Sequence, residues 1–192
     1  MKTFNKALGA LACITMLASG CTTTKGETMA PRSEAPKLNV IDAEVDNALA
    51  KLDTQVPASR ELIHKARGVL VFPSVISAGL VVGGSYGKGA LREGSRTAGY
   101  YSTTAASVGL TAGAESKAIY VLFMTQDSLA RFEASHGWTA GADASVTVLK
   151  VGADGQVTTQ TAQQPIVGFV LTNGGLMVDL SIEGTKFTRI EP

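Results

Sequence analysis

The chain has 192 residues, 45% of them hydrophobic, which suits a single globular domain. It carries 17 Lys and Arg against 16 Asp and Glu. This balance excludes a bulk electrostatic attraction to nucleic acid, and no nucleic-acid partner is expected. Binding to any charged surface would have to come from a local patch.

A secretory signal opens the chain. Lys2 and Lys6 precede an apolar run from Ala7 to Leu17, which is shorter than the about 20 residues that span a bilayer. Small residues stand directly before Cys21, and this pattern resembles a bacterial lipobox. We therefore predict a lipoprotein signal peptide over residues 1–20, cleaved before a Cys21 that carries acyl groups such as palmitate. An ordinary signal peptide with an accidental cysteine is the alternative.

The predicted cleavage decides what the two cysteines can do. Cys13 leaves with the signal, and a lipidated Cys21 has no free thiol, so the mature chain is expected to form no disulfide. No metal site and no cofactor are expected either.

Loss of Lys2 and Lys6 leaves 15 basic residues against 16 acidic ones. Because Thr22 is not the aspartate associated with inner-membrane retention, the resemblance to bacterial lipoproteins implies an outer-membrane anchor facing the periplasm.

The composition changes after Cys21. Residues 22–37 are rich in threonine, glycine and proline and contain little that could pack. We predict a lipidated N-terminus and flexible tether over residues 21–37, with a reach of roughly 20–25 Å. The folded domain is predicted over residues 38–192.

Two helices are predicted at the start of this domain. Apolar residues recur at spacings of three and four between Ile41 and Val56, and the outer face is mostly acidic. Since membrane-binding helices prefer Lys and Arg on that face, this helix is expected to pack on the domain. Pro57 stands near the first turn of a second helix that runs to Ala66, and Gly68 ends it.

Glycine-punctuated strands follow the helices. Pro73 is expected to stop the first of them, and Asp127 to cap a short helix over residues 128–133. The dipeptides Asp154-Gly155 and Asn173-Gly174 predict hairpins. Eight or so short strands with three helices indicate a β-rich antiparallel α+β fold with a curved or barrel-like sheet. Strands are predicted at residues 69–72, 79–91, 99–102, 107–114, 118–124, 144–148, 157–161, 166–171 and 176–182.

One motif suggests catalysis. Residues 83–87 match the G-x-S-x-G pattern of a hydrolase nucleophile elbow, with Ser85 as the nucleophile and His64 or His136 as the base. An elbow needs a strand, a strained turn and then a helix, whereas residues 88–94 form a poor helix. A noncatalytic protein is therefore favoured, and a serine hydrolase using Ser85 is the minor alternative.

Six motifs stand in order along the chain, at residues 66–73, 78–89, 99–102, 107–115, 137–146 and 173–184. Together they resemble the SYLF domain, a lipid-binding module of bacteria and eukaryotes, over about residues 40–190. The resemblance implies a noncatalytic domain that binds phospholipid headgroups or membranes; eukaryotic relatives favour phosphoinositides and can engage actin. For a periplasmic protein, only the general affinity for a phospholipid membrane is carried over.

Local cations are the candidate lipid-binding residues. Lys88 and Arg92 flank the glycine-rich strand, where backbone N–H groups could also meet phosphate oxygens. Lys65 and Arg67 crowd the end of the second helix. For each residue alone, an ordinary solvated charge is the simpler interpretation, and Lys88 with Arg92 is the preferred pair.

A second noncatalytic function stays open. A tethered β domain could act as an envelope scaffold that presents a strand edge or a pocket to another envelope protein. Stoichiometric copurification of a partner, without affinity for protein-free vesicles, would distinguish a scaffold from a lipid-binding module.

Overall fold

The structure is a computed structural model that describes residues 35–79, 82–108, 113–149, 163–172, 175–176 and 181–191. The chain divides into two units, residues 1–32 and 33–192, and all described residues belong to the second. The predicted signal peptide, Cys21, both predicted hairpin dipeptides and the predicted strand at residues 157–161 lie outside the described residues. No described helix combines the length and the apolar character that crossing a bilayer requires.

The two predicted N-terminal helices are present as α1 (Ala35–Gln55) and α2 (Ser59–Lys65). α1 begins before Ile41, where the apolar periodicity starts, and its first turn contains Pro36, whose missing N–H needs no partner there. The last three residues of the predicted tether, 35–37, are therefore helical. The predicted apolar stripe is buried: Ile41, Val45, Ala48, Leu52 and Val56.

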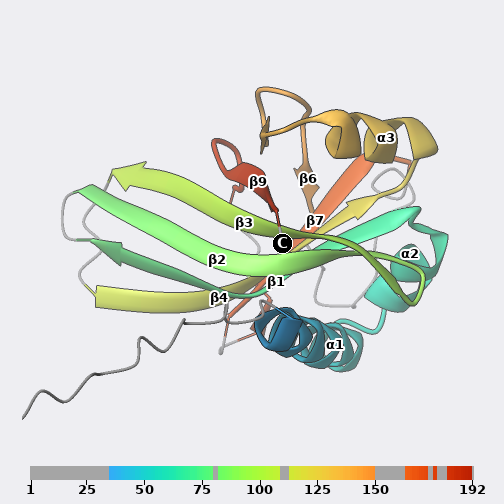
Figure 1. Cartoon of the computed structure of the whole chain (residues 1–192), viewed down its shortest axis with the longest axis horizontal. Coiled ribbons are helices and arrows are strands. Elements are labelled where there is room, and N and C mark those ends of the chain that lie inside the picture. Colours follow the sequence, from blue (N-terminus) through green and yellow to red (C-terminus); the bar gives the residue numbers. More distant parts are fainter. Residues whose placement is uncertain are drawn as a thin grey trace, which may run out of the picture. The chain divides into compact units, whose positions relative to one another are not determined.

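The described strands form one sheet that curls into a half barrel (Figure 1). Its order is β5-β9-β3-β2-β1-β4-β7-β6, with β8 paired to β7, and only β6 and β7 run parallel. The predicted β-rich α+β fold with a curved sheet is confirmed. The strands are β1 (Gly68–Gly79), β2 (Val82–Glu93), β3 (Arg96–Val108), β4 (Gly113–Phe123), β5 (Trp138–Thr139), β6 (Thr147–Val148), β7 (Ile166–Thr172), β8 (Gly175–Leu176) and β9 (Lys186–Ile190).

β1 passes through Pro73, where the sequence predicted that it would stop. Proline lacks the N–H that a central strand needs, but a β-bulge leaves a residue without a ladder partner. The register of β1 shifts between Val71 and Ser74 against β2, and between Phe72 and Val75 against β4. The prediction of a strand ending at Phe72 is wrong because a bulge absorbs the proline.

Gly89 faces this bulge, and we expect Gly89→Ala to destabilise the fold by about 1–3 kcal/mol through overpacking. A Cβ at Gly89 would overlap the carbonyl oxygen of Val71 and lie 2.8 Å from Cδ1 of Phe72. Gly84→Ala on the same strand is the matched control, because its Cβ would meet only the carbonyl oxygen of Ala105, at 3.8 Å. Urea denaturation measures both variants, and equal midpoints would contradict this account.

Other element boundaries also differ from the predictions. The strand predicted at 99–102 is part of β3, which runs continuously from Arg96 to Val108. The strand predicted at 107–114 is not one strand, because its first residues belong to β3 and its last ones to β4, which starts at Gly113. Of residues 144–148 only Thr147–Val148 form a strand, and β9 was not predicted. Alternation along one segment does not report which neighbour it pairs with, so short edge strands are missed or overextended.

Side chains of the central strands alternate between two cores, one on each face of the sheet. α1 and α2 cover the face that we call the α1 face, where Val71 and Tyr120 are buried. The Tyr120 hydroxyl donates to the carbonyl oxygen of Ala48 at 2.9 Å, and burial raises the pKa of Tyr120 to about 12. The opposite face, the α3 face, contains a second core that includes Phe72 and Phe132.

The short helix α3 (Gln126–Ala134) lies on the α3 face and is capped by Thr125, not by Asp127 as predicted. The Thr125 hydroxyl accepts from the backbone N–H of Ser128 at 3.2 Å. Asp127 instead stands in the first turn, where a carboxylate is favourable to the helix dipole, and pairs with Arg131 at 3.0 Å. The cap prediction was therefore wrong by two residues, because both side chains are good acceptors and only the backbone decides which one caps.

Candidate functional site

The outer halves of β1 to β4 form a four-stranded extension, which we call the arm: residues 74–79, 82–88, 102–108 and 113–117. In Figure 1 the four strands extend to the left, past α1 and α3. The inner halves of the same strands hold the two cores. The arm is therefore the part of the described sheet where large side chains need not be buried.

Exposed apolar side chains gather on the α1 face of the arm. The register places Ile76 opposite Tyr86, and Val82 follows on the same face of β2. Ile76, Tyr86 and Val82 are 57%, 50% and 71% exposed. They are three of the four large hydrophobic side chains that are exposed in the described part of the chain. Contiguous exposed apolar side chains mark interaction sites more often than single ones do.

The exposure of the arm is one-sided. On the opposite face Val75, Gly87 and Thr103 are buried, because the sheet curls around that side. On the α1 face the arm residues between the large side chains are small, such as Ala78, Gly84 and Ala106, and all three are exposed. On this face of the arm, Ile76, Tyr86 and Val82 therefore project beyond the small side chains that surround them.

Lys88 lies on this same exposed face, beside the apolar side chains. Its register partners are Ser74 and Ser102, and its side chain is exposed. No described residue forms an ion pair with Lys88. A predicted headgroup-binding cation therefore stands next to an apolar surface with its ammonium group available.

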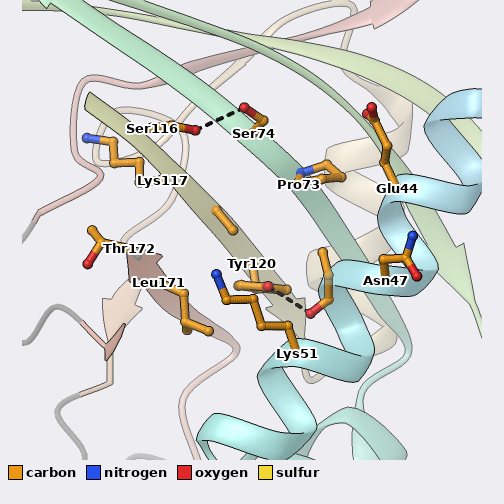
Figure 2. A pocket seen from close by; sticks show the side chains of 12 residues that line it. Glu44, Asn47, Lys51, Pro73, Ser74, Ser116, Lys117, Tyr120, Leu171 and Thr172 are labelled. Atoms are coloured by element: carbon orange, nitrogen blue, oxygen red, sulfur yellow. Dashed lines mark hydrogen bonds between the residues drawn. The ribbon is translucent and has the colours of Figure 1, made fainter. Parts of the chain in front are cut away.

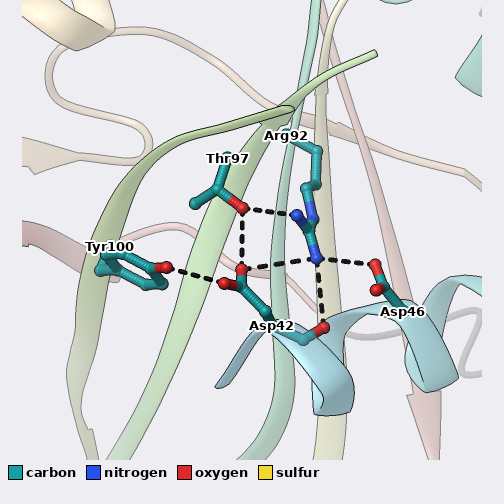
Figure 3. A network of polar contacts seen from close by, with 5 residues as sticks. All are labelled: Asp42, Asp46, Arg92, Thr97 and Tyr100. Carbon is teal, nitrogen blue, oxygen red and sulfur yellow. Dashed lines mark hydrogen bonds and ion pairs between the residues drawn. The ribbon is translucent and has the colours of Figure 1, made fainter. Parts of the chain in front are cut away.

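Arg92 has a different environment, although it lies four residues further along the same strand. Its side chain is only 11% exposed, and its guanidinium contacts Asp46 at 2.7 Å and Asp42 at 3.4 Å (Figure 3). It also donates to Thr97. The structure therefore places Lys88 and Arg92 on one strand but in separate settings, one open to solvent and the other beneath α1.

The carboxylate of Asp42 is the centre of the network around Arg92. Its Oδ1 accepts from the Thr97 hydroxyl at 2.7 Å and its Oδ2 from the Tyr100 hydroxyl at 2.8 Å. Burial and the bond to Asp42 raise the pKa of Tyr100. This network attaches α1 to the β2–β3 hairpin, so the predicted role of Arg92 competes with a structural one.

Lys65 and Arg67 are not brought near Lys88. Lys65 pairs with Glu61 at 2.6 Å on the exposed side of α2. Arg67 is exposed, and its backbone N–H donates to the carbonyl oxygen of Phe123 at 2.7 Å. Seven residues of strand separate Arg67 from Ser74, roughly 20 Å. The four predicted cations therefore do not form one patch.

A pocket that the sequence did not predict adjoins the arm on the α1 face (Figure 2). It has a volume of about 310 Å³ and lies among α1, the β1 bulge, β4 and the end of β7. α1 contributes Glu44 and Lys51, and β4 contributes Lys117. The only available signal was that Glu44 and Lys51 stand seven residues apart, on one face of α1.

Ser85 does not have the setting of a nucleophile elbow. It lies inside β2, paired with Ser77 and Ala105, whereas the motif requires a turn between a strand and a helix. His136 is exposed beyond the end of α3. Within the described residues, no cluster of metal-ligating side chains is present.

Glu133 provides a pH-dependent feature away from the arm. Burial, a hydrogen bond to Glu93 and the charge of Glu93 raise the pKa of Glu133, against the opposing influence of Arg189 and Arg96. A raised carboxyl pKa favours the protonated folded state, so this stability is present below the ordinary value of 4.5 and is lost as pH rises through the folded value. We expect Glu133→Gln to lack this loss of stability with rising pH. The melting temperature of Glu133→Gln minus that of wild type should therefore be larger at neutral pH than at low pH.

Glu61→Gln is a control with the opposite sign. The bond to Lys65 lowers the pKa of Glu61, so its stabilisation is lost as pH falls. Melting temperatures measured across the acidic range for both variants test the assignment. A parallel pH dependence of wild type and Glu133→Gln would contradict it.

Comparison with known families gives a match to the C-terminal part of the chain. Residues 104–191 match the family model described as Ysc84, Las17-binding protein actin regulator. The match covers a little under half of the chain and is consistent with the SYLF-family resemblance that the sequence predicted. None of the curated proteins matches the chain. The matched segment runs from the outer part of β3 to β9 and so includes two of the four arm strands.

Proposed function

We propose that this chain is a noncatalytic, lipid-anchored envelope protein of the outer membrane, facing the periplasm, whose SYLF domain binds phospholipid membranes through the α1 face of the arm. The observation that supports this most directly is the cluster of Ile76, Tyr86 and Val82 beside Lys88. Apolar side chains enter the interfacial region of a bilayer, and the ammonium group meets lipid phosphates.

The expected affinity of the arm alone is modest. Full burial of one large apolar side chain contributes about 1.5–3 kcal/mol, so three half-exposed ones contribute about 3–4 kcal/mol. Each lysine near an anionic surface adds about 1 kcal/mol. Together these correspond to a dissociation constant between about 1 mM and 0.1 mM.

A lipid anchor at Cys21 would make such weak binding effective. The predicted tether would restrict the domain to the neighbourhood of the bilayer, which converts binding of the arm into an intramolecular event at high effective concentration. Anchor and arm would then act together, the anchor supplying attachment and the arm fixing which surface of the domain faces the lipid.

Cosedimentation with vesicles tests the arm without the anchor. Residues 22–192, which contain the whole of the second unit, are made without lipid and mixed with vesicles containing anionic phospholipid. We expect Lys88→Glu to weaken binding about 10- to 30-fold, since it loses one attractive charge and adds one repulsive charge. Val82→Ser with Tyr86→Ser should weaken it by a similar factor.

Two charge reversals serve as controls. Arg131→Glu alters an exposed residue on α3 and should leave vesicle binding unchanged. Lys65→Glu with Arg67→Glu tests the other predicted cations at the far end of β1. Loss of binding in that variant, with normal binding by a folded Lys88→Glu protein, would move the membrane surface from the arm to α2.

A protein-binding function is the second candidate, and one feature favours it. β9 pairs with β3 only along residues 100–104, so within the described residues no strand pairs with Ala105–Val108 on that side. An unpaired strand edge can accept a strand from another envelope protein. A stoichiometric partner whose binding is unaffected by Lys88→Glu, together with no vesicle binding, would favour this function.

A further inference from the structure

The pocket beside the arm has a mixed charge that a plain anion-binding site would lack. We propose that it binds the headgroup of a zwitterionic phospholipid, a phosphodiester that carries a primary ammonium group, as in phosphoethanolamine. This inference rests on the proposed membrane binding and adds to it a headgroup preference. The shared chemistry is also present in soluble glycerophosphoethanolamine.

The pocket has the size of a headgroup site. Its volume of about 310 Å³ is at the lower end of the roughly 300–1,000 Å³ of small-molecule pockets, so acyl chains would remain outside. The floor is apolar, with Tyr120 and Leu171 buried beneath it, and Tyr120 uses its hydroxyl on Ala48. Polar groups stand only around the rim, where they can meet a headgroup without displacing core contacts.

One side of the rim suits a phosphate. Lys51 from α1 lines the pocket, and no described residue forms an ion pair with it (Figure 2). Lys117 of β4 also borders the pocket, but its register partner Val75 is buried on the α3 face, so the Lys117 side chain projects from that face. Ser74 and Ser116 share one hydrogen bond at 3.0 Å. Because one hydroxyl donates to the other, the second still has a proton to donate to a phosphate oxygen.

The other side of the rim suits an ammonium group. Glu44 lies seven residues before Lys51 on the same face of α1, about 10 Å along the helix axis. Asn47 lies between them and adds a side-chain carbonyl acceptor. α1 thus presents the carboxylate of Glu44 and the ammonium group of Lys51 along one face. Both side chains are flexible, so together with the length of the headgroup they can span the distance between the two positions.

The charge pattern selects among headgroups. Glu44 would repel a second negative charge, which disfavours headgroups with an added carboxylate or phosphate. A primary ammonium donates up to three hydrogen bonds to Glu44 and Asn47. A quaternary ammonium donates none and is usually held by several aromatic faces, whereas Tyr120 is the one aromatic residue of the described lining. Ethanolamine is therefore preferred over choline.

The arm continues from the pocket in the direction that the acyl chains would take. Ser74 lines the pocket and Ile76 follows on the same face of β1, opposite Tyr86. A lipid with its headgroup between α1 and β4 can thus extend its apolar part over the arm. The pocket and the arm face form one continuous surface with a polar end and an apolar end.

Two binding measurements on residues 22–192 test the pocket. The first compares vesicles in which phosphatidylethanolamine or phosphatidylcholine is mixed with the same fraction of phosphatidylglycerol. We expect binding at least about threefold tighter with phosphatidylethanolamine, since even 0.7 kcal/mol gives that ratio. Glu44→Gln should abolish the preference, and Lys51→Met should abolish it while Lys51→Arg retains it. The second measurement titrates soluble glycerophosphoethanolamine and follows chemical shifts of residues around Ser116.

A surface glutamate supplies the matched control. Glu61→Gln removes an exposed carboxylate on α2 and should leave the headgroup preference unchanged. The melting temperature of each variant verifies folding, and all altered side chains are exposed.

The outcomes separate this inference from the proposed function. Binding with a preference that Glu44→Gln removes supports both. Equal binding to the two vesicle types overturns the pocket assignment and leaves the arm as a membrane surface. Saturable shifts with glycerophosphoethanolamine but no vesicle binding support the pocket and overturn the arm. Neither vesicle binding nor shifts, in a folded protein, overturns both.

Discussion

Phe132→Ala is expected to lower the free energy of unfolding by about 3–5 kcal/mol, the range for deleting a buried aromatic side chain. Phe132 is 1% exposed and joins α3 to the sheet. Its ring centroid lies 4.9 Å from that of Tyr101, 4.8 Å from that of Phe123 and 5.7 Å from that of Trp138. Truncation removes these contacts together and leaves a cavity that four surrounding elements cannot all close.

Trp138 makes this prediction simple to measure. It is the only tryptophan of the chain and is 3% exposed, so its fluorescence during urea denaturation reports on this core. Phe132→Leu is the matched control and should cost about 1–1.5 kcal/mol because it retains most of the buried volume. An alanine variant within 1 kcal/mol of wild type would contradict the assigned role of this aromatic cluster.

Arg92→Met should lower the free energy of unfolding by about 2–4 kcal/mol, because it leaves a partly buried carboxylate without its cation. The Asp42 side chain is 27% exposed, so water offsets part of this loss. The methionine keeps the apolar stem and separates the effect of charge from that of packing. Chemical denaturation of the variant gives the value directly.

Arg96→Met is the control on the same hairpin. Arg96 is 70% exposed and pairs with Glu93, and exposed pairs contribute only about 0–1 kcal/mol. The double variant Arg92→Met with Asp42→Asn should recover part of the stability, since no unpaired charge remains. Equal losses in Arg92→Met and Arg96→Met would show that the network is merely a surface feature.

The pattern of the sequence predicted the fold class because it depends on local periodicity. The α1 stripe from Ile41 to Val56 repeats at helical spacing, and the strands are apolar and glycine-rich, so their existence could be predicted. The passage of β1 through Pro73 could not, because it requires Gly89 on the neighbouring strand to leave room for a bulge. Such compensation joins residues distant in sequence and has no local signature.

The candidate site was predictable only in part for the same reason. Lys88 and Arg92 look equivalent in sequence, four residues apart beside glycines. Their difference arises from Asp42 and Asp46 on α1, about fifty residues earlier, which engage only Arg92. The pocket was not foreseen because Lys51 on α1 and Ser116 on β4 come from separate elements, which border one pocket only after the sheet has formed.

The attachment of α1 has a mechanical consequence. Any tension applied to the N-terminal side of the domain enters at Ala35 and reaches the first turns of α1. There the bonds of Asp42 and Asp46 to Arg92 add to the burial of Ile41 and Val45, before the load reaches the rest of the buried stripe. Those bonds pass the load to β2, a central strand held by two neighbours along its length. A domain pulled from this end would therefore resist peeling of its first helix, and the pocket beside α1 would keep its shape under load.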